Sequence, residues 1–445
     1  MIVLLLMLVL YKSQRAWSLF LFFVCIKGGC NVLPFGTGML KIEDMSLVYI
    51  FIIMIYHALI GDRQMFVMDK MAKNIWYLLL FLIAATFFSW LYYEVPLPMV
   101  LQMVRYHLYI LAYFVLRRQS YADLLKCLKL LGSLTLICAV LYCFQIPLNR
   151  SLLLNPNENL DRSDDYGGFS RFTNIPPYAA MFMFLSVFTG SSFVLWKVRK
   201  KFLVPGVYIV MRLLTMGRTA ILTNFSALLL GICWKRKTYI KWIVVGCIVM
   251  LPVIAFVMES FVNRGTSGDL EGIMRGEYKN YVTGYKGNGE ETTMLYRIAW
   301  AYERLLYLSE RPLPEQLMGM AYISDSSPLV RKYYRFTING YGGEDDFQIL
   351  RSYDIAFGNL ITQFGILGSI ALLNLWIYLF LAFYRNRRST LAFASLIYLI
   401  SFFMESIAGM GFTQLTNIVP FFLLYVLMKK SGHQELTVNK IINKQ

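Results

Sequence analysis

The sequence is poor in charged residues and in histidine, and its few cysteines follow no recognisable pattern. Only 16% of the 445 residues are charged, against about 25% in a soluble globular domain. All seven cysteines lie in apolar runs or at their ends, which excludes a disulfide framework in any polar loop. The three histidines are His57, His107 and His433. No Cys or His spacing suits zinc, and we predict neither a metal nor a cofactor.

Apolar residues make up 58% of the chain, and they stand in long blocks separated by polar residues. A bilayer core of about 30 Å requires about 20 apolar residues per helix. The blocks of that length cover residues 16–35, 44–60, 74–93, 98–116, 123–144, 173–195, 202–216, 218–234, 239–258, 354–384, 389–407 and 411–428. A further run, 1–10, lacks a signal-peptide cleavage site and is interpreted as a short or tilted helix. We predict an all-α polytopic membrane protein with about 12–13 transmembrane helices.

The net charge of +17 comes from alternate loops. The basic groups are Lys12 and Arg15; Arg63, Lys70 and Lys73; Arg117, Arg118, Lys126 and Lys129; Lys197, Arg199, Lys200 and Lys201; Lys235, Arg236, Lys237 and Lys241; Arg385, Arg387 and Arg388; and Lys429 and Lys430. The positive-inside rule places these loops in the cytoplasm. Because the charge forms no single stripe, we expect no nucleic-acid partner.

This orientation divides the chain into four parts. Residues 1–258 form an N-terminal membrane bundle with a short outer loop at 145–171, and 259–353 form a large extracytoplasmic loop. Residues 354–428 form the C-terminal membrane helices, and 429–445 form a cytoplasmic tail. Within the large loop, apolar residues recur at helical spacing over 292–310, and Pro312 and Pro314 follow. We therefore predict an amphipathic helix there that ends before the prolines.

Several charges within or beside the apolar blocks fall at one predicted depth, the outer boundary of the membrane. They are Arg105, Arg171, Arg212, Arg218, Asp354 and Glu405. Intramembrane charges are functional candidates, and the guanidinium fork suits phosphate. The cluster therefore indicates an anionic ligand. The alternatives stay open: an arginine can snorkel to lipid headgroups, Asp354 can cap a helix, and Glu405 can be the buried partner of an arginine.

Four stretches resemble motifs of the O-antigen polymerase and O-antigen ligase superfamily. They are RFTNIPPYAAMFMF from Arg171, MGRTAILTNFSALLLG around Arg218, YRIAWAYERLLYLSERPLPEQLMGMA with Arg297, and YDIAFGNLITQFGILG with Asp354. The resemblance implies a multi-pass enzyme of the bacterial cytoplasmic membrane, with its large loop periplasmic or extracellular. Its substrate would be an oligosaccharide repeat unit of O-antigen, capsule or exopolysaccharide linked to undecaprenyl diphosphate. Membrane lipid, a chain-length regulator and a flippase are the further partners it implies.

The resemblance implies a polymerase that transfers the growing glycan to the next lipid-linked unit. Arg218 and Arg171 are the first candidates to stabilise the leaving diphosphate, with Asp354 as a base. The substrate-binding candidates are Arg212, Arg297, Arg105, Asp345, Asp346 and Glu405. Ligases of the superfamily carry a histidine where Asp354 stands, and no histidine lies in 259–353, which favours polymerase over ligase. A ligase and a lipid-linked oligosaccharide flippase or transporter remain the alternatives.

Overall fold

The computed structural model describes most of the chain as helix. The residues described are 2–33, 41–154, 172–191, 193–200, 202–215, 217–235, 276, 293–324, 327, 329–334, 336, 356–409 and 411–442. The α-helices are α1 (Ile2–Ser13), α2 (Arg15–Ile26), α3 (Ile42–Leu59), α4 (Lys70–Leu91), α5 (Leu97–Val104), α6 (Ala112–Arg118), α7 (Tyr121–Leu148), α8 (Ala179–Thr189), α9 (Leu203–Leu214), α10 (Arg218–Lys235), α14 (Thr293–Ser309), α15 (Leu313–Met318), α16 (Leu329–Tyr333), α17 (Ala356–Arg385), α18 (Thr390–Glu405) and α19 (Val419–Ile442). Short 3-10 helices are η1 (Gly28–Asn31), η2 (Arg63–Phe66), η3 (Arg105–Leu111), η5 (Ser406–Ala408), η6 (Gly411–Thr413) and η7 (Leu415–Ile418). The described residues contain no strand, as predicted for an all-α protein.

Five of the described helices are long and apolar enough to cross a membrane. They are Ile42–Leu59, Lys70–Leu91, Leu97–Arg118, Tyr121–Leu148 and Ala356–Arg385. Six shorter apolar helices of 10–17 residues accompany them. Large apolar side chains remain exposed on these helices, for example Ile55, Leu80 and Ile370. Because such extended apolar surface is costly in water and a helix satisfies its own backbone hydrogen bonds in lipid, the bundle has the character of a helical membrane protein.

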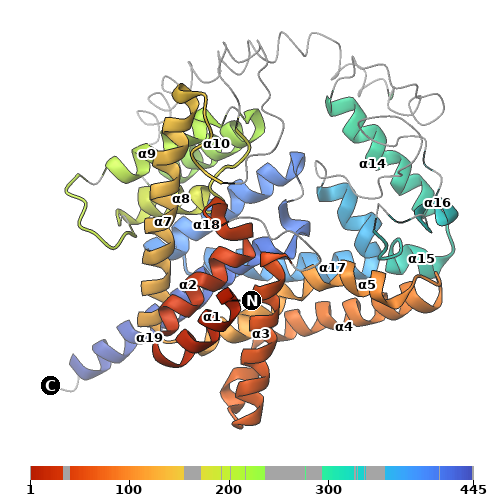
Figure 1. The fold of residues 1–445 in the computed structure, drawn as a ribbon, viewed down its shortest axis with the longest axis horizontal. Helices are drawn as coiled ribbons and strands as arrows, with labels where there is room; N and C mark the ends of the chain where they lie inside the picture. Colours follow the sequence, from red (N-terminus) through yellow and green to blue (C-terminus); the bar gives the residue numbers. More distant parts are fainter. Residues whose placement is uncertain are drawn as a thin grey trace.

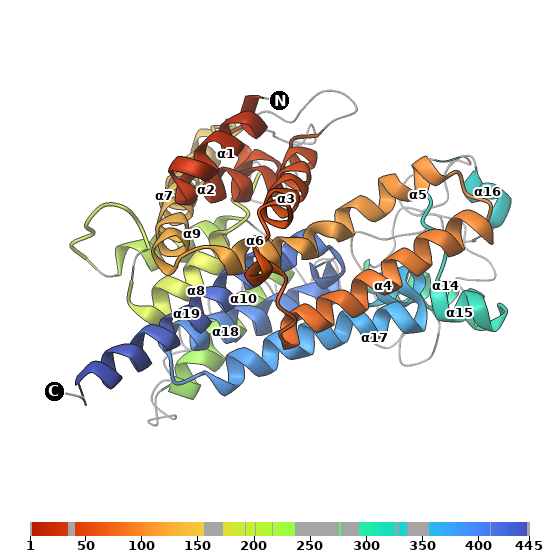
Figure 2. The ribbon, with the colours of Figure 1, turned by 90° about the horizontal axis from the view of Figure 1, so that it is seen from below.

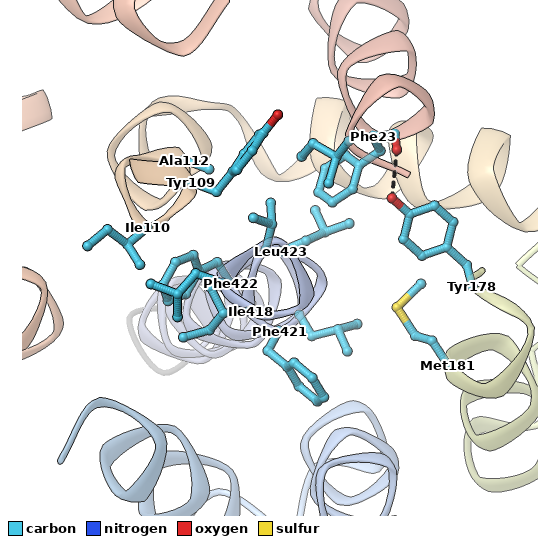
Figure 3. Close-up of a cluster of buried hydrophobic side chains, with 14 of the residues drawn as sticks. Phe23, Tyr109, Ile110, Ala112, Tyr178, Met181, Ile418, Phe421, Phe422 and Leu423 are labelled. Carbon is cyan, nitrogen blue, oxygen red and sulfur yellow. Dashed lines mark hydrogen bonds between the residues drawn. The ribbon is translucent and has the colours of Figure 1, made fainter. Parts of the chain in front are cut away.

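The first part of helix α19, residues 419–428, is buried on all sides within the bundle (Figure 3). Ile418, Phe421, Phe422 and Leu423 are fully buried and lie between α2, α8 and the η3–α6 segment. The Tyr178 hydroxyl donates a 2.6 Å hydrogen bond to the carbonyl oxygen of Phe23. A helix that is apolar all round is expected inside a core, and this one ties the N-terminal helices to the C-terminal ones.

Basic residues from distant parts of the sequence gather at one end of the bundle, here called the basic end. Arg117, Arg385, Lys429, Lys430 and Lys70 line one cavity there. Beside it, the Oδ2 atom of Asp62 accepts a hydrogen bond from the Arg118 Nε, and the Nδ1 of His57 lies 2.9 Å from the same oxygen. The Arg118 hydrogen bond holds the pKa of the Asp62 carboxyl below its usual value. Four of the basic groups noted in the sequence therefore meet at one cavity.

Helix α15, which follows the predicted amphipathic segment, docks on a broken apolar helix, α17. Figure 2 shows α4, α5 and α17 running side by side toward α15 and α16. Helix α17 is interrupted at Gly365, where φ is 59° and ψ is −167°. The backbone of Gly319, at the end of α15, fits against this break, and the Met320 amide donates to the Thr362 carbonyl at 2.7 Å. Two glycines thus allow backbone-to-backbone contact that any Cβ would prevent.

Most predicted helices are present, but several begin or end elsewhere. The predicted helix 292–310 is confirmed as α14, and Pro312 precedes a new helix, α15. The predicted span 16–35 ends at Ile26, because Gly28 and Gly29 take positive φ values that no helix continues through. The span 173–195 is helical only over α8, since Pro176 and Pro177 delay its start. The span 239–258 lies outside the described residues.

Candidate functional site

Several predicted site residues lie outside the part of the chain that the structure describes. Arg171, Asp345, Asp346 and Asp354 fall in segments that are not described. Arg218 is the first residue of α10, but its side chain is likewise not described. The roles predicted for these residues remain predictions. Arg105, Arg212, Arg297 and Glu405 can be placed.

Arg212 and Glu405 meet at the end of the bundle opposite the basic end. Arg212 comes from the last turn of α9 and Glu405 from the last residue of α18, and their closest charged atoms are 3.6 Å apart. The Arg212 side chain is 9% exposed and that of Glu405 is 36% exposed. Among the described residues, the Nε atom of Arg212 has no hydrogen-bond partner. The guanidinium is therefore largely buried beside one carboxylate, and its Nε donor is unused, which is costly unless another acceptor binds.

Arg212 lines a cavity of about 230 Å³, here called the cation cavity. Its other lining residues include Lys27, Tyr178, Tyr398, Glu405, Asn417 and Pro420. The Lys27 ammonium donates to the side-chain oxygen of Asn417, whose amide nitrogen donates to the Gly411 carbonyl at 2.8 Å. Lys27 is thus fixed at the wall of the cavity and is only partly buried.

Two helices also direct their N-terminal ends toward the cation cavity. Pro177, Tyr178 and Ala180, at the start of α8, line one wall, and Asn417 and Pro420, at the entry to α19, line another. A helix N-terminus carries a partial positive charge. Together with the two side-chain cations, these ends make the cavity suitable for an anion.

Arg105 lies apart from the cation cavity, next to residues that line a second cavity. It interrupts the α5–α6 span at the first residue of η3, and its guanidinium lies 3.3 Å from Asp44 at the start of α3. The neighbouring Tyr106 and His107 line a cavity of about 400 Å³ with Lys41, Glu43, Met103, Gln363, Thr413, Gln414, Leu415 and Thr416. We call it the polar cavity, because most of these side chains carry a polar group.

The two cavities lie on either side of η7. Leu415 and Thr416 line the polar cavity, and the next residue, Asn417, lines the cation cavity. Lys27 and Glu43, which line different cavities, are close enough to interact electrostatically. The predicted outer cluster of charges is therefore divided: Arg212 with Glu405 on one side, and Arg105 with Asp44 on the other.

Arg297 lies apart from both groups. It belongs to α14, which packs against α17, and it lines neither cavity. In Figure 1, α14 stands on the opposite side of the molecule from α9 and α10. Arg297 therefore does not share the site of Arg212 in this structure.

Sequence reasoning missed Lys27 and Glu43. A signal for Lys27 was present, because it falls inside the predicted span 16–35, and a lysine in a span is a functional candidate. Glu43 carried no such signal, since it stands just before the predicted span 44–60. Only the fold, in which η7 packs on η3 and α19, reveals that both residues line cavities. Comparison with protein-family models and with curated proteins finds no match to this chain.

Proposed function

We propose that the protein is a membrane polymerase of lipid-linked oligosaccharide repeat units. The growing glycan would leave undecaprenyl diphosphate and join the next lipid-linked unit at the outer face of the membrane. The observation that carries this proposal is the cation cavity, in which Lys27 and Arg212 stand with two helix N-termini. Such a group of positive charges suits a diphosphate headgroup more than a neutral ligand.

The orientation follows from the two ends of the bundle. The basic end carries Arg117, Arg385, Lys429 and Lys430, and the positive-inside rule assigns such an end to the cytoplasm. The cation cavity lies at the other end, which in this proposal faces the periplasm or the cell exterior. Twelve or thirteen spans, the large outer loop 259–353 and the cytoplasmic tail complete this topology.

The chemistry requires stabilisation of a leaving diphosphate. As the bond between the anomeric carbon and the phosphate oxygen breaks, its electron pair passes to the diphosphate. Fixed cations stabilise that charge without reorganising during the reaction. Arg212 and Lys27 would supply two of them, and Arg218, which begins α10 three residues beyond the α9 C-cap Thr215, would add a third. Arg171 and Asp354 keep their predicted roles in leaving-group stabilisation and as a base.

Two other functions fit parts of the molecule. A ligase of the same superfamily would use the same cation cavity but pass finished glycan to another acceptor. A flippase would carry charges near the membrane midplane along its route, whereas Lys27, Arg212 and Glu405 all stand at helix ends. The positions of these charges favour transfer at one face over transport.

The lipid-linked intermediate that accumulates without the protein tests the proposal. A polymerase predicts single repeat units on the outer face, a ligase predicts long lipid-linked chains, and a flippase predicts single units on the inner face. The purified protein should then extend those single units in detergent, where no sides exist. Accumulation of long chains, or the absence of extension by the purified protein, would contradict the proposal.

A further inference from the structure

The polar cavity has the composition of a site for a saccharide. Its wall carries a carboxylate from Glu43, an amide from Gln363, a phenol from Tyr106, and hydroxyl and amide groups from the segment 413–416. Its volume of about 400 Å³ falls within the usual range of small-molecule sites. Each sugar hydroxyl both donates and accepts hydrogen bonds. A saccharide site therefore needs several hydrogen-bond donors and acceptors, here beside the aromatic ring of Tyr106.

Glu43 differs sharply from the carboxylate next to it. Asp44 accepts a 2.9 Å hydrogen bond from the Lys41 backbone amide and pairs with Arg105, so its role at the start of α3 is structural. The carboxylate of Glu43 makes no hydrogen bond or ion pair with any described residue. Its Coulombic partners Lys41, Lys27 and Arg105 act from further away. Among the carboxylates that line the two cavities, Glu43 is the one without a side-chain partner in the described chain.

The backbone of Glu43 is nevertheless held firmly. Its carbonyl oxygen accepts hydrogen bonds from Tyr109 at 2.5 Å and from Ser46 at 2.6 Å. Tyr109 and Ser46 are themselves buried, and their hydroxyls are 2.8 Å apart. Glu43 is thus a partly buried carboxylate on a fixed backbone, and it lines a cavity without a side-chain partner in the described chain. Such a group can accept a hydrogen bond from a ligand in that cavity.

Glu43 also lies close to the cation cavity. Lys27, on the wall of the cation cavity, interacts electrostatically with Glu43 on the wall of the polar cavity. η7 contributes Leu415 and Thr416 to the polar cavity and Asn417 to the cation cavity, and Lys27 is bonded to η7 through Asn417. The two cavities are therefore neighbours that share η7 in their walls.

We propose that the polar cavity binds the sugar of the acceptor and that Glu43 receives the proton of its attacking hydroxyl. This inference rests on the proposed polymerase function. The acceptor oxygen forms a bond to the anomeric carbon of the donor sugar while the bond from that carbon to the diphosphate oxygen breaks. The hydroxyl proton passes to the Glu43 carboxylate, and the electron pair of the broken bond passes to undecaprenyl diphosphate. Glu43 then returns the proton to the diphosphate or to water.

A variant of Glu43 that keeps its size but loses its charge tests this step. Single lipid-linked units, extracted from cells that lack the protein, serve as substrate for the purified protein in detergent. Glu43→Gln should lower the maximal rate at least tenfold, while its affinity for undecaprenyl diphosphate stays within twofold of the unmodified protein. Gln363→Leu should instead raise the unit concentration needed for half the maximal rate, because it removes a sugar contact without removing the base.

The matched control is Glu310→Gln, an exposed glutamate that lines neither cavity. It should leave the rate unchanged, and Glu43→Gln should elute and melt as this control does. A normal rate in Glu43→Gln would overturn the inference, and so would a loss of undecaprenyl diphosphate binding as large as the loss of rate. If the unmodified protein extends no units at all, the proposed function itself fails. That result is distinct from an active protein that tolerates Glu43→Gln.

Discussion

Replacing Arg212 tests whether this arginine binds a ligand or only stabilises the fold. The Arg212 side chain is 9% exposed and its closest carboxylate oxygen lies 3.6 Å away, beyond hydrogen-bond distance. A hydrogen bond from a charged donor contributes about 1.5–3 kcal/mol, so the loss of one or two to a diphosphate costs about 3 kcal/mol. At about 1.4 kcal/mol per tenfold, Arg212→Gln should lower kcat/KM for polymerisation by about a hundredfold.

The partner variant Glu405→Gln supplies the comparison. Glu405 is 36% exposed, and an ion pair of that exposure contributes less than about 1 kcal/mol. The ligand account therefore predicts less than a fivefold change in kcat/KM for Glu405→Gln, measured on the same lipid-linked units. The double variant should resemble Arg212→Gln alone. If instead both single variants lose activity equally and the double variant loses no more, Arg212 acts only through Glu405, and the account of the cation cavity is refuted.

Three further outcomes follow from the geometry. In Gly365→Ala the added Cβ would lie 2.3 Å from the Gly319 amide nitrogen, so the free energy of unfolding should fall by at least about 2 kcal/mol; an unchanged melting temperature in detergent would contradict this. The pKa of Asp62 is lowered in the folded protein, so its contribution to stability is present above the unfolded carboxyl pKa and is lost as pH falls through the folded pKa. The difference in melting temperature between the unmodified protein and Asp62→Asn should therefore shrink on acidification. A constant difference would exclude this linkage. Inorganic diphosphate should raise the melting temperature with increasing concentration, and equal stabilisation of Arg212→Gln would show that it binds elsewhere.

The sequence patterns predicted the helices better than they predicted the site. Long apolar blocks such as 123–144 and 354–384 gave long helices, because twenty apolar residues have few alternatives to a buried or lipid-facing helix. The alternation of basic loops anticipated the shared end of Arg117, Arg385 and Lys429. Helix ends were harder to place, since the left-handed Gly28 and Gly29 that end α2 depend on local turns within an otherwise apolar stretch.

The pairing of charges depended on packing that a single sequence does not contain. A buried arginine partner was one of the alternatives left open for Glu405; in the fold Glu405 lies 3.6 Å from Arg212 but is 36% exposed. Arg105 was grouped with Arg212 by depth alone. In the fold it faces Asp44 instead, because α3 and η3 meet on the other side of η7. Depth along a helix can be estimated from sequence, but position around the bundle axis requires the helix contacts.

His107 is a residue that lines a cavity but was not predicted from the sequence. It was not among the predicted site residues, yet it lines the polar cavity from the 3-10 helix Arg105–Leu111. Its ring lies edge-on to Tyr322 and Phe364, with centroids 5.7 and 5.2 Å away. A 3-10 stretch inside a long apolar run leaves no clear pattern in composition, and such stretches often mark functional positions.

The central claim is that a lipid diphosphate binds between the first turns of α8 and α19, in contact with Arg212 and Lys27. An experimental structure of the full chain in a lipid nanodisc with undecaprenyl diphosphate tests it most directly. The claim predicts density for both phosphates within hydrogen-bond distance of the Arg212 guanidinium and the Lys27 ammonium. Phosphate density only at the basic end, beside Arg117 and Lys429, would contradict it.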